Sequence, residues 1–185
     1  MLKTIWEFIK HPTYQEDENK NLKYRISVFG RLLFIGLITS ILLLNLASMI
    51  QNIFGLDTGD HAIEEMWDTY SLPMVIFLGV IVAPFFEELL FRGTMVFFRN
   101  SLNFKYIFYV LTLVFGYIHI SNFEITTTTL LLSPLLVAPQ IAVGALFGFI
   151  RVRFGLIWAI LLHATYNLVL FVPFVIAKVL DIPLE

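Results

Sequence analysis

Five apolar segments separated by short polar turns dominate this sequence, and they restrict the folds that it can adopt. We expect membrane spans at residues 26–50, 71–98, 106–120, 130–150 and 154–180. A helix of about 20 apolar residues crosses the hydrocarbon core, where the backbone has no water to bind. Only 14% of the residues are charged and 58% are hydrophobic, which excludes a large soluble domain. The predicted fold is an all-α polytopic transmembrane helix bundle of about five to six spans, with residues 1–185 forming a single membrane domain.

The basic residues predict the orientation of this bundle. Most Lys and Arg residues lie in residues 1–31 or in the turns at 99–105 and 151–153, whereas 51–70, 121–129 and 181–185 contain none. Because basic loops stay on the cytoplasmic side, residues 1–25 are predicted to be a cytoplasmic N-terminal segment of a multi-pass cell-membrane protein. Residues 1–23 lack the apolar core of a signal peptide, and 4–10 are expected to form a short amphipathic turn at the interface.

Several local patterns refine the spans. Gly144 and Gly148 lie four residues apart, which favours the close approach of another helix. The threonine-rich stretch 121–129 predicts a turn or a re-entrant segment, and Pro173 is a candidate break in the fifth span. The acidic loop 51–70 is interpreted as solvated, because it lacks the ligand spacing of an EF-hand.

The second span carries the most unusual feature of the sequence, three charged residues within an apolar run. Glu87, Glu88 and Arg92 lie in VIVAPFFEELLFRGTMVFF. Charge inside hydrocarbon costs several kcal/mol, so such residues are paired or functional. Glu88 and Arg92 are four apart and share a helix face, whereas Glu87 is rotated by about 100°. We therefore expect Glu88 to pair with Arg92 and Glu87 to face the bundle, with a local kink at Pro84.

Polar groups from three spans are predicted to meet at one depth. From the basic end of each helix, the rise of 1.5 Å per residue places Glu87 at roughly 18 Å and His119 at roughly 21 Å. His163 lies at roughly 15 Å and Asn167 at roughly 21 Å on the same scale. His163 and Asn167, four residues apart, are expected to project together, as are Phe115 and His119.

Three kinds of chemistry are open to such a layer. A carboxylate beside an imidazole can take a proton from water, while His and Asn side chains stabilise the resulting oxyanion. Two His and a Glu could instead hold zinc, but the sequence has no His-Glu-x-x-His helix, so zinc is not favoured. Intramembrane Glu and His also serve transporters, although so few spans argue against a transport pathway. The absence of cysteine excludes thiolate metal sites and a cysteine nucleophile.

Three motifs lie on the second, third and fifth predicted spans. They are Glu87-Glu88-Leu-Leu-Phe-Arg92, Phe115-Gly-Tyr-Ile-His119 and His163-Ala-Thr-Tyr-Asn167, which match Glu-Glu-x-x-x-Arg, Phe-x-x-x-His and His-x-x-x-Asn. In this order they resemble the motifs of the CPBP family of CAAX proteases and bacteriocin-processing proteins, also called Abi. The resemblance covers the core of the chain, and we take residues 71–172 as the catalytic core helices.

The resemblance implies an intramembrane glutamic endopeptidase, a hydrolase that needs no metal or other cofactor. It implies that Glu87 activates water with help from His119, that His163 and Asn167 stabilise the oxyanion, and that Glu88 and Arg92 support them. It also implies a peptide or protein substrate at the lipid bilayer, without nucleic acid. It favours the maturation of bacterial peptides or bacteriocins, or self-immunity, over CAAX processing. The alternatives are a non-catalytic immunity or partner-binding membrane protein and, less favoured, a small transporter.

Overall fold

A computed structural model of the chain describes residues 1–59, 66 and 69–180. In these residues there are helices and no β-strand. Five helical segments are long and apolar enough to cross a membrane; they are Leu22–Phe54, Leu72–Phe98, Phe104–Asn122, Thr127–Phe154 and Leu156–Val179. The prediction of an all-α polytopic bundle is therefore confirmed, and the chain is a multi-pass membrane protein. Residues 60–65 and 67–68 of the acidic loop predicted at 51–70, and the tail 181–185, lie outside the described residues.

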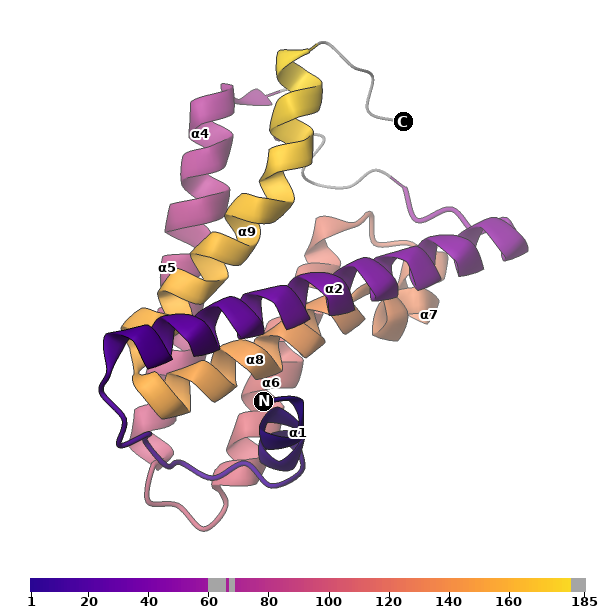
Figure 1. The fold of residues 1–185 in the computed structure, drawn as a ribbon. Helices are drawn as coiled ribbons and strands as arrows, with labels where there is room; N and C mark the ends of the chain where they lie inside the picture. Colours follow the sequence, from indigo (N-terminus) through magenta and orange to yellow (C-terminus); the bar gives the residue numbers. More distant parts are fainter. Residues whose placement is uncertain (60–65, 67–68, 181–185) are drawn as a thin grey trace.

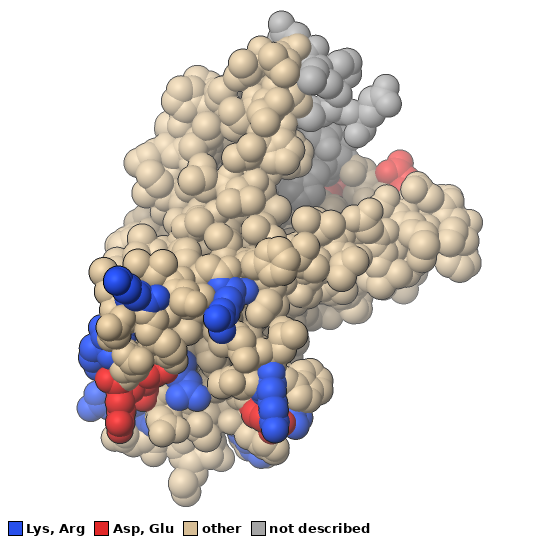
Figure 2. All heavy atoms as spheres, in the orientation of Figure 1, with Lys and Arg blue, Asp and Glu red and all other residues tan. Residues whose placement is uncertain are grey.

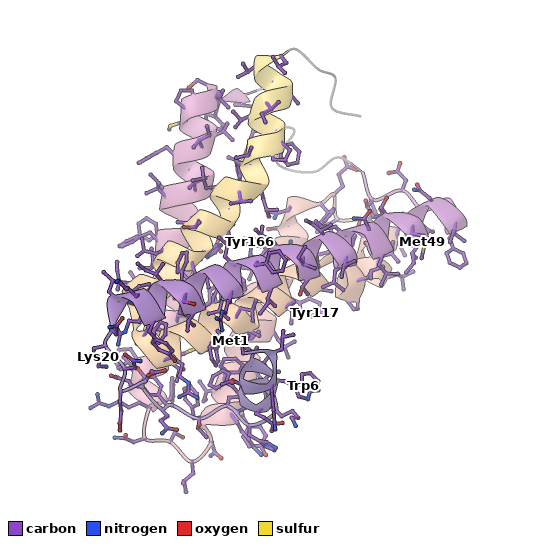
Figure 3. All side chains as sticks on the ribbon, viewed as in Figure 1. Met1, Trp6, Lys20, Met49, Tyr117 and Tyr166 are labelled. Atoms are coloured by element: carbon purple, nitrogen blue, oxygen red, sulfur yellow. The ribbon has the colours of Figure 1, made fainter. Side chains whose placement is uncertain are left out.

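The first helix, α1 (Leu2–Lys10), covers one end of the bundle (Figure 1). The sequence predicts only an interfacial turn here, but the segment is a helix that buries Ile5 and Phe8. The ring of Phe8 meets those of Phe108 and Phe149 edge to face, with centroids 5.2 Å apart in each pair. Trp6, on the other face, is 60% exposed and points away from the bundle (Figure 3). Contact with the core thus stabilises the helix. This contact could not be predicted from the amphipathic pattern of the segment alone.

The second span is a continuous helix whose hydrogen-bond register changes along its length. It consists of α4 (Leu72–Ile76), a π-helix η1 (Phe77–Val82), α5 (Ala83–Glu88), a second π-helix η2 (Leu89–Gly93) and a 3-10 turn η3 (Thr94–Phe98). Pro84, in the first turn of α5, has no N–H to donate to the preceding turn. The wider π turn lies directly before it, with the N–H of Ala83 bonded to the carbonyl of Leu78. The predicted irregularity at Pro84 therefore takes the form of a π-helix, a feature frequent at functional sites.

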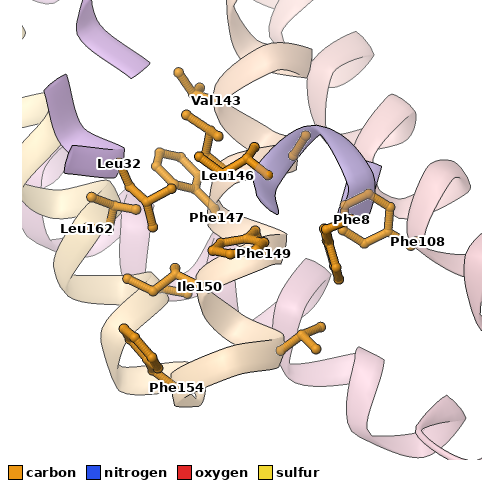
Figure 4. Close-up of a cluster of buried hydrophobic side chains, with 14 of the residues drawn as sticks. Phe8, Leu32, Phe108, Val143, Leu146, Phe147, Phe149, Ile150, Phe154 and Leu162 are labelled. Atoms are coloured by element: carbon orange, nitrogen blue, oxygen red, sulfur yellow. The ribbon is translucent and has the colours of Figure 1, made fainter. Parts of the chain in front are cut away.

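Helix α8 (Ala138–Phe154) is the centre of the bundle, and α2 (Leu22–Phe54), α6 (Phe104–Ile118) and α9 (Leu156–Val179) pack around it. Its apolar side chains meet those of all three neighbours in the core cluster of Figure 4. Gly144 and Gly148 allow α6 to approach, because a Cβ at Gly148 would lie 2.5 Å from Phe108 and one at Gly144 would lie 2.8 Å from Phe115. The packing role predicted for this glycine pair is confirmed.

The structure corrects two predictions about helix ends. The polar stretch 121–129 is not a turn throughout, since α7 (Thr127–Leu136) begins within it. Thr126 caps that helix by accepting a hydrogen bond from the N–H of Thr129 (3.1 Å), so part of the threonine run starts a helix instead of interrupting one. Pro173 does not break α9, which runs through it, because a membrane helix tolerates the loss of one backbone hydrogen bond.

The glycine pair gives a direct test of this packing. Gly148→Ala should destabilise the protein by about 1–3 kcal/mol, because the buried ring of Phe108 cannot move away from the new methyl group. Gly30→Ala is the matched control, since Gly30 lies in helix α2 with no atom within 4 Å of a Cβ there. It should be neutral or stabilising. Unfolding of both variants in one detergent measures the difference, and equal stabilities would contradict the close packing of α6 on α8.

Candidate active site

The two charges buried deepest in the second span, Glu88 and Arg92, form an ion pair. Oε1 of Glu88 lies 3.1 Å from Nη1 of Arg92, and the side chains are 0% and 1% exposed. Nη2 of Arg92 also donates to the carbonyl oxygen of Gly144 (3.0 Å), and the guanidinium lies 3.9 Å from the centroid of the Phe115 ring. A buried charge is tolerated only with such partners. The ion pair expected from the four-residue spacing is present.

Glu88 has a second partner that the spacing did not predict, His163 of α9. Nδ1 of His163 lies 3.0 Å from the same Oε1 atom, and its ring stacks on Phe147 at a centroid distance of 4.5 Å. With Glu88 ionised, Nδ1 carries the proton and donates it, so the other ring nitrogen, Nε2, is directed elsewhere. Glu88 therefore fixes both the arginine and the orientation of the imidazole.

Glu87 faces a different set of groups, the Nε2 atoms of two histidines. Its Oε2 atom lies 3.8 Å from Nε2 of His119 and 3.9 Å from Nε2 of His163. The side chain is 25% exposed, while Oε2 itself is buried and accepts no hydrogen bond from the described residues. Nδ1 of His119 donates to the carbonyl oxygen of Phe115 (2.8 Å), which leaves Nε2 of the neutral ring as an acceptor toward Glu87. Three helical segments thus meet at one carboxylate oxygen.

Asn167 lies one turn beyond His163 on α9, but its recorded partner is not a site side chain. Its Nδ2 atom donates to the carbonyl oxygen of Gly79 (2.8 Å) in the π-helix η1. The shared face of His163 and Asn167 is as expected, since both contact the second span. The amide carries two N–H groups, so one remains beyond the bond to Gly79.

Several residues outside the predicted set hold the site together. Arg151 is buried and donates from Nε to the carbonyl oxygen of Arg92 (2.9 Å) and from Nη1 to the hydroxyl of Tyr14 (3.0 Å). Tyr166, beside α2 in Figure 3, donates to the hydroxyl of Ser40 (2.7 Å). The polarity of Tyr166 within a span was a usable signal, whereas the backbone acceptors leave no trace in a sequence. Within residues 1–59, 66 and 69–180, no three His, Cys, Asp or Glu side chains are arranged to hold a metal ion.

These features define a multi-pass membrane protein with a Glu/His/Arg cluster buried between its helices. The family model described as "Type II CAAX prenyl endopeptidase Rce1-like" matches residues 69–169, which include every residue of the cluster. The chain belongs to this family, within the CPBP group, and is thus a member of a family of CAAX-type membrane proteases. No curated protein and no solved structure matches it significantly.

The two adjacent glutamates should differ sharply in what they contribute to stability. Glu88→Gln should cost about 3–5 kcal/mol, because Arg92 loses the charge that compensates its own in a buried position. Glu87→Gln, at a partly exposed carboxylate without an arginine partner, should change stability by less than about 1 kcal/mol. Thermal unfolding of both variants in the same detergent compares them, and the reverse order would rule out this division of roles.

Proposed function

We propose that this protein is an intramembrane endopeptidase in which Glu87 activates a water molecule for attack on a peptide bond. The observation that carries the proposal is the position of Glu87 Oε2, 3.8 Å from His119 Nε2 and 3.9 Å from His163 Nε2. A carboxylate and an imidazole are the groups that general-base catalysis uses. Their location on separate helices supports an assembled site rather than a single structural polar contact.

The donor and acceptor pattern supports water as the nucleophile. Glu87 Oε2 and, in the neutral ring, His119 Nε2 are both acceptors, and they face each other beyond direct hydrogen-bond distance. A water molecule with its two O–H groups can donate to both, which orients a lone pair toward a substrate carbonyl carbon. As the water attacks, its proton passes to Glu87. The same carboxyl group then delivers a proton to the leaving amine nitrogen as the C–N bond breaks.

His163 and Asn167 are the groups proposed to stabilise the oxyanion. Because Nδ1 of His163 donates to Glu88, Nε2 can donate to the oxyanion when both ring nitrogens carry a proton. The second N–H of Asn167 is the other donor, with the first one holding the amide on Gly79. Glu88 and Arg92 are positioning residues in this scheme, since Glu88 orients His163 and Arg92 holds the Glu88 carboxylate.

The family match and the location of the cluster support a membrane-associated peptide as the proposed substrate. The description of the matched family names a CAAX prenyl endopeptidase, so a prenylated peptide is the first candidate substrate. It belongs to the broader class of membrane-associated peptides and proteins. Maturation of bacterial peptides or bacteriocins, and self-immunity, stay predictions of the motif resemblance. The mechanism uses no metal ion or other cofactor, and no nucleic acid takes part.

Peptide cleavage by the purified protein in lipid vesicles tests the proposal. Farnesylated CAAX peptides and a quenched peptide library are suitable substrates. Glu87→Ala and His119→Ala should each reduce the cleavage rate by about 100-fold or more, the typical contribution of a general base. Glu124→Ala is the matched control, an exposed glutamate in the loop after the site histidine, and should leave the rate unchanged. Cleavage that survives both site changes would disprove the glutamate mechanism, and a wild-type protein that cleaves nothing would favour the non-catalytic alternative.

Metal removal separates this mechanism from a zinc-dependent one. Cleavage should continue at the same rate after treatment with 1,10-phenanthroline and dialysis, because Glu87 and His119 activate water without a Lewis acid. The control is thermolysin in parallel, a zinc enzyme that loses activity under this treatment. A strict requirement for added zinc would show that the water is activated by a metal and that the roles given to Glu87 and the histidines are wrong.

A further inference from the structure

Two adjoining cavities lie at the basic end of the bundle, away from the Glu87 cluster. The larger, of about 410 Å³, lies between α1, the segment that follows it and the end of α8. The smaller, of about 190 Å³, lies between α1, the start of α2 and the same end of α8. Thr4 and Arg153 line both cavities, and none of the site residues lines either. Arg153 therefore stands where the two cavities meet.

Three cations that line these cavities form no ion pair with the described residues. Arg153 and Lys3 line the larger cavity, and Arg153 and Arg31 line the smaller. Among the described residues, none of these three side chains takes part in a recorded ion pair or side-chain hydrogen bond; the guanidinium of Arg153 lies 5.8 Å from the Phe149 ring. Arg153 is partly buried, so its charge is partly removed from water without an ion-pair partner among the described residues.

The carboxylates in the two cavities are already engaged by other groups. Glu7 in the larger cavity forms an ion pair with Lys10, with Oε1 2.8 Å from Nζ. Asp17 in the smaller cavity accepts hydrogen bonds from the hydroxyl of Tyr24 (2.8 Å) and the N–H of Asn19 (2.9 Å). Lys10 neutralises Glu7, whereas Asp17 keeps its negative charge. Lys3, Arg31 and Arg153 outnumber this one carboxylate, so the lining has a net positive charge that favours an anionic ligand.

We propose that these cavities bind the phosphate group of an anionic phospholipid headgroup, with Arg153 at the centre and Lys3 and Arg31 on either side. Arginine presents several N–H donors in a planar fork that suits phosphate oxygens. Lys and Arg gather at this end of the molecule, where α1 lies and α2 begins (Figure 2). Basic pockets between membrane helices on the cytoplasmic side are suited to such headgroups. The exposed Trp6 and Leu2 on the outer face of α1 are of the kind that sits at the membrane interface.

Thermal unfolding in a neutral detergent tests the proposal with three probes, dioctanoyl phosphatidylglycerol, dioctanoyl phosphatidylcholine and sodium phosphate. Phosphatidylglycerol should raise the Tm of the full chain by about 3 °C or more, because a ligand that binds only the folded state stabilises it. Phosphatidylcholine, which has no net charge, should give a much smaller rise. An equal rise with sodium phosphate would support the phosphate site but overturn the assignment to a lipid, and no rise with any probe would overturn both.

Matched variants locate the effect. Lys3→Gln/Arg31→Gln removes two exposed cavity cations and should abolish most of the rise, as should Arg153→Gln. Lys23→Gln/Lys105→Gln removes the same charge from exposed positions outside both cavities and should keep the full rise. If this control loses the rise to the same extent, the lipid responds only to general surface charge and the site is wrong. A full rise in both cavity variants would also overturn the proposal.

Discussion

One buried carboxylate, that of Glu88, organises the core of this protein. Its Oε1 atom contacts both the guanidinium of Arg92 and Nδ1 of His163, so it joins the second span to α9. It also compensates the charge of Arg92, which would be unfavourable alone in hydrocarbon. The aromatic rings of Phe115 and Phe147 pack against the same guanidinium and imidazole. Removing water from these groups strengthens their attraction, and each buried charge depends on the other, because either one alone would be uncompensated.

The register changes in the second span determine which way its two glutamates face. Each π turn adds a residue to one turn and so rotates the helix that follows it. The π-helix η1 precedes Glu87, and η2 follows Glu88. Asn167 binds the carbonyl of Gly79 within η1, and Arg151 binds the carbonyl of Arg92 within η2. Neighbouring helices thus supply donors where the regular helical ladder is interrupted, which a membrane requires of irregular backbone.

Much of this arrangement follows from spacing, and the remainder depends on contacts that spacing does not encode. The five spans, the Glu88–Arg92 pair and the meeting of Glu87 with His119 and His163 were all predictable, because helical rise and periodicity determine depth and face. The bond between Glu88 and His163 was not, since periodicity says nothing about how two helices are rotated against each other. Backbone acceptors such as Gly79 and Gly144 leave no side-chain signal at all. The α-helix at the N-terminus likewise depends on a core that the segment itself does not contain.

The N-terminal third of the chain, which lies outside the family match, nevertheless bears on the site. Tyr14 holds the guanidinium of Arg151, which in turn binds the carbonyl of Arg92, so the segment after α1 reaches the ion pair through one intermediate side chain. On α2, Ser40 accepts the hydroxyl of Tyr166, a residue between His163 and Asn167 in the sequence. Two separate contacts therefore fix the rotation of the helices that carry the cluster. The helices of residues 69–169 contain the Glu/His/Arg cluster, and residues 1–54 restrict its geometry.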